Sequence, residues 1–435
     1  MPIEERTIMT NYLPRTADDL LAKRLAAFGA VNIVGPKGCG KTTTAKQQAE
    51  SVVEFQDEDA REGLLQVVRS QPSRLLIGPK PRLFDEWQDA PKIWGAIRKS
   101  VDDEGEKGLY ILTGSSASDV ETPHTGTLRI STLEMLPMSL AESRESNGEA
   151  SVSALFDDPS SFDGCHSDLD VDGLIYAICR GGWPGALSVP DGDLRLEVAR
   201  DLFWQTAHVD ISKIDGIKRN PLWAEAIIRS YARNLCTTAQ KKTLVADVRA
   251  NHEIGETTFF EYIAALEKLR IVSDIPAWSP AIRSKTSIRA ARKRNLVDPS
   301  VAVAALGLSP GYFNTDFKTL GFLFECLCIR DLKAYSSPAR GSVSYYRDRY
   351  GLEADAVLHL EDGRYALIEF KLGSHEVEEG ARHLCEIERL VREYNETEPQ
   401  VPIRPPDLKL VITGAEYGFR RDDGVLVIPV GCLAP

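Results

Sequence analysis

Short apolar runs alternate with stretches of helical periodicity along the first 140 residues. The mostly apolar run 30–34 predicts a buried strand, and the pattern of 43–49 predicts a helix soon after it. Two further strands are predicted, a short one at 82–84 and an apolar run at 109–112, each far enough along the chain for a crossover helix. Residues 1–140 are therefore expected to form an α/β domain with a parallel sheet and helices on both faces.

The pattern changes twice in the middle of the chain. Residues 141–172 are polar and acidic, with clusters of Ser, Gly and Asp, and predict a linker or an inserted loop. Helical periodicity returns over 173–240, which predicts an all-helical, lid-like segment. Residues 241–308 contain two helical patterns joined by a turn and followed by two short strands, the arrangement of a winged helix-turn-helix with a basic loop.

The last part of the chain, residues 309–435, predicts a second α/β domain. The Asp362-Gly363 turn between two runs of alternating apolar and polar residues indicates a tight hairpin. The expected order is helix 317–333, strand 343–347, strand 353–360, strand 365–371, helix 376–394 and strand 408–413.

The composition is that of a globular protein of several domains. The 435 residues carry a net charge of −12, so only a local patch is expected to attract nucleic acid or an anionic membrane. No apolar run reaches the length of a membrane span, and the first residues have no signal-peptide pattern. The eight cysteines form neither a zinc-binding nor a disulfide pattern. We therefore expect a cytoplasmic protein without a membrane partner.

Residues 35–42 fit the phosphate-binding pattern G-x-x-x-x-G-K-[ST], placed between the predicted strand and helix. Glycines let backbone N–H groups surround a phosphate, Lys41 reaches the terminal phosphates of ATP, and the Thr42 hydroxyl holds Mg²⁺. A simple glycine-rich turn is the alternative, which the flanking strand and helix disfavour. The predicted nucleotide-binding residues are Gly35, Pro36, Lys37, Gly38, Cys39, Gly40, Lys41, Thr42 and Thr43.

Asp85 and Glu86 directly follow the strand predicted at 82–84. In a site that hydrolyses ATP, Asp85 would hold Mg²⁺ through water, and Glu86 would orient and deprotonate the attacking water. The next predicted strand ends at Thr113-Gly114-Ser115-Ser116, beside the phosphate site of a parallel sheet. Ser115, or else Thr113, is a candidate to hydrogen-bond the γ-phosphate, with an ordinary serine-rich turn as the open alternative.

The stretch from Arg283 to Arg294 is rich in Arg and Lys and contains no acidic residue. It suits contact with nucleic-acid phosphates, and a solvated loop that balances the acidic body is the alternative. The second helix of the predicted winged helix begins with Gly255, Glu256 and Thr257, which lack the basic and amide side chains of a DNA reader. We therefore expect that helix to have a structural role or to contact another subunit of an oligomer.

Asp355 and the pair Glu369 and Lys371 lie on opposite strands of the predicted C-terminal hairpin, in the pattern D-x13-E-x-K. Residues 369 and 371 point to the same face because strand side chains alternate. Carboxylates suit a hard cation such as Mg²⁺, and a metal at this position can drive hydrolysis of a phosphodiester.

Strings spread along nearly the whole chain resemble one family, the prokaryotic AAA-type P-loop ATPases fused to a C-terminal domain of unknown function. The resemblance implies ATP binding, hydrolysis and a homo-oligomer. It suggests Arg129 as a trans-acting arginine, although Leu128 stands where such proteins usually have glycine. A helical lid usually carries an arginine toward the nucleotide, and Arg180 is one candidate among several for that role. The strings are Tyr12-Leu13-Pro14-Arg15, Gly35 to Thr44, Asp85 to Pro91, Leu112 to Ser116, Leu136 to Ser139, Gly181 to Pro184 and Leu296 to Pro299.

Residues 316–415 resemble the PD-(D/E)xK nuclease superfamily in element order and acidic spacing. The resemblance implies a restriction-endonuclease-like fold in which Asp355 and Glu369 ligate Mg²⁺, Lys371 positions water, and Glu325 is an accessory acid. Ala354 departs from the pattern, since proline usually precedes the first acid. Two interpretations stay open, an intact nuclease site and a scaffold that keeps the fold without cleaving.

Together these features predict a Mg²⁺-dependent ATPase of the AAA type that controls a nuclease-like domain acting on nucleic acid. The alternative is a nucleotide-gated switch that binds DNA or a protein while its C-terminal domain is catalytically silent. The steady-state ATPase rate, with and without DNA, separates the two hypotheses.

Overall fold

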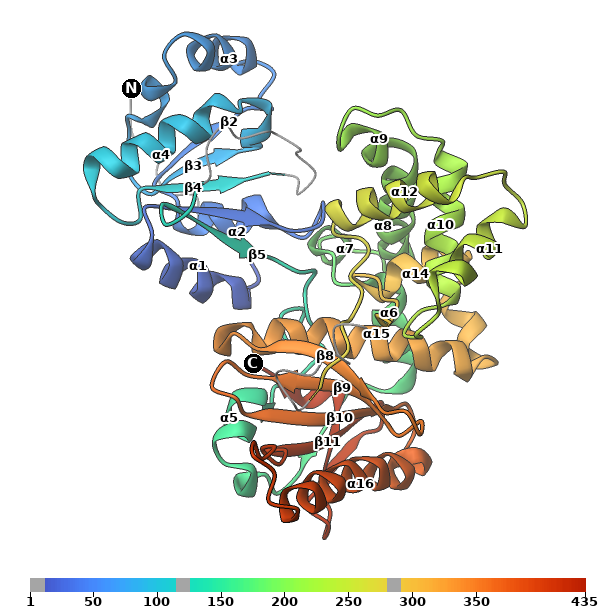
Figure 1. The fold of residues 1–435 in the computed structure, drawn as a ribbon. Coiled ribbons are helices and arrows are strands. Elements are labelled where there is room, and N and C mark those ends of the chain that lie inside the picture. The colour runs from blue at the N-terminus through green and yellow to red at the C-terminus, as the bar shows by residue number, and fades with distance from the viewer. Residues whose placement is uncertain (1–11, 115–125, 280–290) are drawn as a thin grey trace. The chain divides into compact units, whose positions relative to one another are not determined.

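The computed structural model of the chain describes residues 12–114, 126–279 and 291–435 (Figure 1). The chain divides into two compact units. The first consists of residues 1–136 and 213–217, and the second of residues 137–212 and 218–435. No helix among the described residues is long and apolar enough to cross a membrane.

The first unit is built on a five-stranded sheet in which each neighbouring pair of strands is parallel. The parallel α/β fold predicted for this part of the chain is confirmed. Strand β4 lies between β1 and β3, so the carboxyl ends of these three strands meet at one edge. The strands are, in spatial order, β2 (Ser51–Glu54), β3 (Arg82–Asp85), β4 (Tyr110–Thr113), β1 (Ala30–Val34) and β5 (Ile130–Glu134).

Helices cover both faces of this sheet (Figure 1). Helix α4 (Lys92–Glu104) shows why: its buried residues Ile93, Trp94, Ile97 and Val101 recur at helical spacing and form one apolar stripe. The helix ends at Gly105, whose φ of 69° lies in the left-handed region that favours glycine. The other long helices of the unit are α1 (Thr16–Ala27), α2 (Lys41–Gln48) and α3 (Arg61–Ser70).

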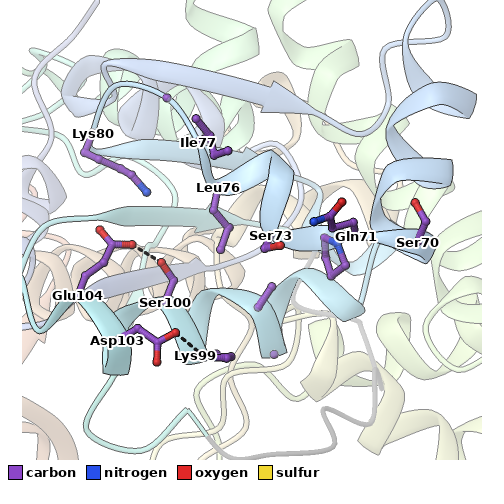
Figure 2. A pocket seen from close by; sticks show the side chains of 14 residues that line it. Ser70, Gln71, Ser73, Leu76, Ile77, Lys80, Lys99, Ser100, Asp103 and Glu104 are labelled. Carbon is purple, nitrogen blue, oxygen red and sulfur yellow. Dashed lines mark hydrogen bonds and ion pairs between the residues drawn. The ribbon is translucent and has the colours of Figure 1, made fainter.

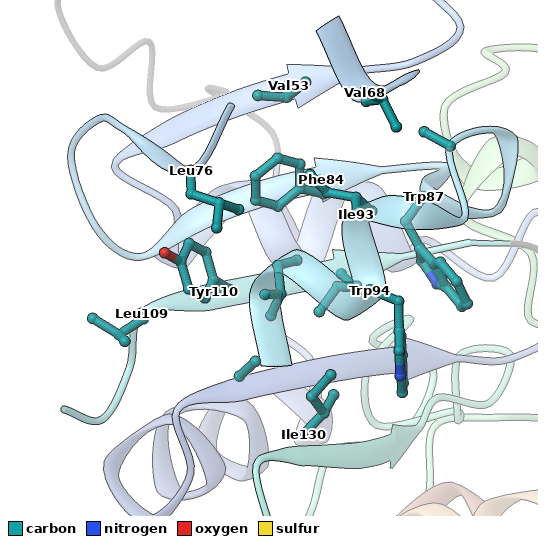
Figure 3. Close-up of a cluster of buried hydrophobic side chains, with 14 of the residues drawn as sticks. Val53, Val68, Leu76, Phe84, Trp87, Ile93, Trp94, Leu109, Tyr110 and Ile130 are labelled. Carbon is teal, nitrogen blue, oxygen red and sulfur yellow. The ribbon is translucent and has the colours of Figure 1, made fainter. Parts of the chain in front are cut away.

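The core between this sheet, α3 and α4 is rich in aromatic side chains (Figure 3). The rings of Trp87 and Trp94 lie 4.8 Å apart, and Phe84 contacts both Phe55 and Tyr110. Burying an aromatic side chain stabilises a fold by roughly 1.5–3 kcal/mol. Trp87 follows Asp85 and Glu86 directly, so this packing also anchors the segment that carries the two predicted site acids.

The middle of the chain is helical, as the periodicity of 173–240 predicts. Asp170, Asp191 and Asn220 each accept a backbone N–H at a helix start, which is why these helices begin where they do. The helices are α6 (Val171–Arg180), α7 (Pro184–Leu187), α8 (Gly192–Gln205), α9 (Ile211–Lys213) and α10 (Pro221–Arg233).

Two helices and a short ribbon follow. Helices α11 (Lys241–Arg249) and α12 (Glu256–Lys268) are joined by a short turn. After α12 the chain forms two antiparallel bridges, Val272 with Leu296 and Ile275 with Lys293. Helix α14 (Pro299–Leu306) completes this region.

The C-terminal part contains a seven-stranded sheet in the order β7-β12-β13-β11-β10-β9-β8. Strands β8, β9 and β10 are antiparallel neighbours, and β10, β11 and β13 are parallel. Helix α16 packs on the sheet through its buried residues, among them Val377, Ala381 and Leu384. The elements are α15 (Phe317–Ser336), β8 (Ser342–Arg347), β9 (Glu353–His359), β10 (Tyr365–Lys371), α16 (Val377–Glu396), β11 (Leu408–Thr413), β12 (Tyr417–Arg420) and β13 (Leu426–Pro429).

The segment 141–172, predicted as a linker or an inserted loop, forms short elements that pair with the end of the chain. Its strand β7 (Cys165–His166) pairs with β12, and its strand β6 (Ala150–Ser151) pairs with β14 (Leu433–Ala434). Between them lies helix α5 (Val152–Asp157). Strands of two residues leave no periodicity in a sequence, and partners more than 250 residues away are invisible to local patterns.

Candidate functional site

The predicted phosphate loop joins β1 to α2, and glycine is required at three of its positions. Gly38 and Gly40 have φ values of 80° and 100°, a region that residues with a side chain rarely adopt. A Cβ on Gly35 would lie 2.2 Å from the backbone oxygen of Met135. The loop therefore keeps a backbone shape that only these glycines permit.

Lys41 and Cys39 are held inside the loop. The Lys41 ammonium donates hydrogen bonds of 2.9 Å to the backbone oxygens of Gly35 and Pro36, and the side chain is buried. Burial raises the pKa of the Cys39 thiol, so Cys39 packs as a neutral side chain. Lys41 thus spans the loop at the position where a phosphate-binding lysine is needed.

Arg15 braces the loop from outside, a role that the local pattern does not predict. Its guanidinium donates to the backbone oxygens of Cys39 and Leu136, each at 2.8 Å. Tyr12 donates to Asp18 at 2.6 Å and lies 2.9 Å from the Thr44 hydroxyl. The Tyr12–Arg15 string is part of the family resemblance, and these contacts supply its physical reason.

Three oxygen-bearing side chains meet at the carboxyl ends of β3 and β4 and the start of α2. The hydroxyls of Thr42 and Thr113 both donate to the Asp85 Oδ1 atom, at 2.7 and 2.5 Å. Thr113 is fully buried and paired with Asp85 across the β3–β4 register. Thr113 therefore positions the Asp85 carboxylate.

Glu86 occupies an unusual backbone position directly after β3. Its φ of 53° and ψ of 47° are left-handed, a conformation that costs a residue with a side chain about 1–2 kcal/mol. Gln88 donates its amide N–H to the Glu86 carboxylate. Such strain concentrates at functional sites, where the surrounding fold supports it. Ser115, the other predicted contact to phosphate, lies outside the described residues.

Asp355, Glu369 and Lys371, predicted from the D-x13-E-x-K pattern, lie close together in the second unit. Asp355 accepts the backbone N–H of Phe370 at 3.0 Å, and the Lys371 ammonium lies 2.9 Å from a Glu369 oxygen. Helix α16 passes over this pair at Gly380, where a Cβ would lie 3.1 Å from Lys371 Cε. Burial, followed by the Asp355 charge, raises the pKa of Glu369 to about 8.

A second lysine, Lys293, reaches the same acidic cluster. Its ammonium lies 2.7 Å from Glu325, 3.5 Å from Glu353 and 3.8 Å from Asp355. Burial alone would lower the pKa of Lys293, but these carboxylates raise it, so the side chain is a cation. We name the side chains of Glu325, Glu353, Asp355, Glu369, Lys371 and Lys293 the acidic centre.

The structure removes two residues of the basic stretch Arg283 to Arg294 from the predicted phosphate-binding surface. Lys293 and Arg294 are buried, and Arg294 pairs with Asp274, so neither is available to nucleic-acid phosphates. Arg292 is exposed, whereas Arg283, Lys285 and Arg289 lie outside the described residues. A run of basic residues in a sequence does not distinguish a surface patch from buried partners of acids.

A Mg²⁺ ion fits the two predicted sites differently. In the first unit, a hydroxyl and a carboxylate stand next to the phosphate loop, which is the donor set of a nucleotide-bound Mg²⁺. In the acidic centre, ammonium groups already lie against the carboxylates. No group of three or more His, Cys, Asp or Glu side chains among the described residues is arranged to hold a metal ion.

Three family models match separate parts of the chain. Residues 27–143 match an AAA domain. The N-terminal unit is an AAA-type P-loop ATPase domain. Residues 171–312 match a domain of unknown function (DUF8612), and residues 320–433 match another (DUF4143). One model thus spans both the predicted helical lid and the predicted winged helix.

The solved structures that this chain matches include the Walker-type ATPase paby2304 of Pyrococcus abyssi, at 12% identity and a TM-score of 0.42. The match covers 70% of this chain and 99% of that one. The replication initiator DnaA bound to AMPPCP and single-stranded DNA is 14% identical, with a TM-score of 0.27. The match covers 58% of this chain and 86% of the DnaA chain. AMPPCP-bound DnaA from Aquifex aeolicus is 13% identical over 60% and 89%, with a TM-score of 0.23. Because all three TM-scores lie below 0.5, the assignment rests on the family match. A comparison with curated proteins gives no match.

Arg129 lies at the opposite edge of the ATPase sheet from the phosphate loop. Its backbone oxygen accepts the N–H of Ala30, the first residue of β1, and its guanidinium pairs with Asp102 at 2.7 Å. The loop begins after Val34, about 16 Å away along a five-residue strand. Arg129 therefore does not line the nucleotide site of its own chain. Arg180 is buried in the second unit, paired with Glu145.

Leu128, the departure next to Arg129, adopts a left-handed conformation with a φ of 66°, and its side chain is 77% exposed. We expect Leu128→Gly to stabilise the ATPase domain by up to about 1 kcal/mol, because relief of about 1–2 kcal/mol of strain exceeds the extra chain entropy of glycine. Thermal unfolding measures the gain. Leu128→Ala is the matched control, since alanine retains the strain. Equal stability of both variants would contradict the prediction.

A groove of the ATPase domain lies away from the nucleotide site (Figure 2). It encloses about 800 Å³ between α3, α4 and the segment before β3. Lys80 and Glu104 line it at the amino-terminal ends of β3 and β4, whereas Asp85 and Thr113 end these strands at the other edge. Burial lowers the pKa of Lys80 to about 8, and its ammonium lies 3.5 Å from the centre of the Tyr110 ring.

Proposed function

We propose that the ATPase domain binds ATP with Mg²⁺ and hydrolyses it. The observation that carries the proposal is the meeting of Thr42 and Asp85 at 2.7 Å beside a loop that holds Lys41. Thr42 and Asp85 would hold the Mg²⁺, which neutralises the charge of the phosphates. This pairing requires α2 and β3 to lie side by side, and a glycine-rich turn alone would not produce it.

The roles of the chain's own residues follow from their contacts. Lys41 donates hydrogen bonds to the terminal phosphate oxygens in place of the carbonyls of Gly35 and Pro36. Glu86, held by Gln88, accepts a proton from the attacking water at a carboxylate oxygen. Thr113 fixes Asp85, and Arg15 keeps the loop in shape. The predicted role of Arg129 as an arginine that acts on a neighbouring copy stays a proposal, and its distance from its own loop is compatible with that role.

The second unit is proposed as a binding module that the nucleotide state controls. Helices α11 and α12 with the bridges at Val272 and Ile275 support a winged-helix arrangement. The exposed start of α12 carries Glu256 and Thr257, which favours a structural or protein contact over DNA reading. The order of elements around Asp355 and Glu369, with α15 before the strands β8, β9 and β10 and α16 after them, supports a nuclease-like fold. The poor fit of a metal ion favours the catalytically silent alternative.

Glu86→Gln tests the proposed hydrolysis. We expect steady-state ATP turnover to fall about 10²–10⁴-fold, because the amide cannot accept the proton, while ATP binding is retained. Turnover is measured by phosphate release and binding by titration calorimetry. The matched control is Glu54→Gln, an exposed acid at the end of the neighbouring strand β2, which should hydrolyse like the wild type. Wild-type turnover by Glu86→Gln would sink the assignment of Glu86 as the base.

A further inference from the structure

Lys293 stands where a divalent cation would be expected in the acidic centre. Glu325 comes from α15, Glu353 and Asp355 come from β9, and all three carboxylates lie within 4 Å of the Lys293 ammonium. The ammonium also donates a hydrogen bond of 3.2 Å to the Asp355 backbone oxygen. The ammonium thus contacts oxygen atoms of three carboxylates and one backbone carbonyl, and it lies 5.5 Å from the centre of the Tyr345 ring.

Lys293 is fixed in this position from both sides of its backbone. Its N–H donates to the Ile275 oxygen, and its own oxygen accepts the Ile275 N–H, each at 2.9 Å. The following residue, Arg294, is tied to Asp274, and the Tyr345 hydroxyl donates to the oxygen of Ala291. The Lys293 side chain is only 2% exposed. It is thus a permanent part of the centre and not a surface side chain that happens to fold inward.

The remaining acid of the centre has its own cation. The Glu369 side chain is 3% exposed and lies 2.9 Å from the Lys371 ammonium. Asp355 uses its other oxygen to accept the Phe370 N–H. The acids that the nuclease resemblance assigns to a metal are therefore already engaged by ammonium and amide groups. A metal ion in addition would bring a double positive charge close to the buried Lys293 ammonium and the partly buried Lys371 ammonium.

We propose that the Lys293 ammonium is the resident cation of the acidic centre, that it replaces a divalent ion there, and that a latent divalent-cation site appears when Lys293 is removed. An ammonium neutralises carboxylates and holds them together, but it has no Lewis acidity to activate water. The centre accordingly stabilises the C-terminal domain without cleaving phosphodiesters. This inference concerns the second unit and is independent of ATP hydrolysis at Lys41 and Glu86.

The test is thermal unfolding of the full chain with and without millimolar MnCl₂, in the absence of nucleotide. Lys293→Ala should lower the unfolding midpoint of the second unit by about 10 °C, because it leaves buried carboxylates without a partner. Mn²⁺ should restore at least half of that loss in Lys293→Ala and should not shift the wild type. The double variant Lys293→Ala/Asp355→Asn, which lacks a ligand of the latent site, should gain nothing from Mn²⁺.

Titration calorimetry with Mn²⁺ supplies a second measurement that does not depend on the stability of a variant. We expect no saturable binding to the nucleotide-free wild type, as for Asp355→Asn. Stoichiometric Mn²⁺ binding by the wild type that Asp355→Asn abolishes would overturn the proposal. It would also be overturned if Lys293→Ala were as stable as the wild type and indifferent to Mn²⁺. Neither result bears on the ATPase rate, so the two proposals fail separately.

Discussion

Lys41→Ala is expected to abolish ATP binding, with the dissociation constant rising at least about 100-fold. Hydrogen bonds from a charged donor each contribute roughly 1.5–3 kcal/mol, and the Lys41 ammonium makes two such bonds to loop carbonyls that ATP phosphates would take over. Its side chain is buried within the loop. Titration calorimetry with ATP and Mg²⁺ measures the change.

The matched control is Lys46→Ala, one helical turn further along α2. Lys46 is exposed and pairs with Glu54, so its loss should leave the ATP affinity unchanged. Unfolding curves of both variants separate lost binding from a lost fold. ATP binding by Lys41→Ala at wild-type affinity would mean that residues 35–42 form only a glycine-rich turn.

The sequence predicts the central strands of the ATPase sheet well and its edges poorly. Strands β1 and β4 are covered on both faces, so they appear as nearly continuous apolar runs, whereas β3 has only Leu83 and Phe84 and is identified by the Asp85-Glu86 pair at its end. The edge strands β2 (Ser-Val-Val-Glu) and β5 (Ile-Ser-Thr-Leu-Glu) each have only two apolar residues. Their positions depend on pairing with neighbours, which a local pattern does not contain.

The same division holds for the functional residues. The loop and Lys41 are contiguous in sequence, so their geometry follows from a local motif and its flanking strand and helix. The brace from Arg15 to Cys39 and Leu136 joins distant segments and has no local signal. Lys293 is the clearest case, because its neighbours in sequence suggest a phosphate-binding surface, whereas its partners in space are three carboxylates.

The sequence does contain one sign of these buried charged side chains. The predicted helix 317–333 is apolar around most of its circumference, yet it includes Glu325, Arg330 and Asp331. Charged residues in a buried helix require partners, and the structure supplies Lys293 for the first and Asp298 for the second. What the sequence lacked was the identity of these partners, since both lie more than 30 residues away.

Arg330→Ala is expected to destabilise the second unit by about 3–5 kcal/mol, the largest loss of stability that we predict. Arg330 lies 2.8 Å from Asp298 and 2.7 Å from Asp331, and all three side chains are buried. Although burial works against its charge, the two carboxylates raise the pKa of Arg330. The variant leaves both carboxylates in the interior without a cation. Urea unfolding followed by tryptophan fluorescence measures the loss.

The partners of Arg330 explain why this loss should spread through the unit. Asp298 also accepts the N–H of Gly182, and Asp331 accepts the N–H of Leu140, each at 3.0 Å, so one guanidinium stabilises the junction of four chain segments. Arg340→Ala is the matched control, because its pair with Glu361 is exposed and contributes less than about 1 kcal/mol. If Arg330→Ala cost no more than this surface variant, the buried carboxylates would have to be neutral in the folded protein. The triple variant Arg330→Met/Asp298→Asn/Asp331→Asn should be more stable than Arg330→Ala, because it leaves none of these three positions with a buried charge.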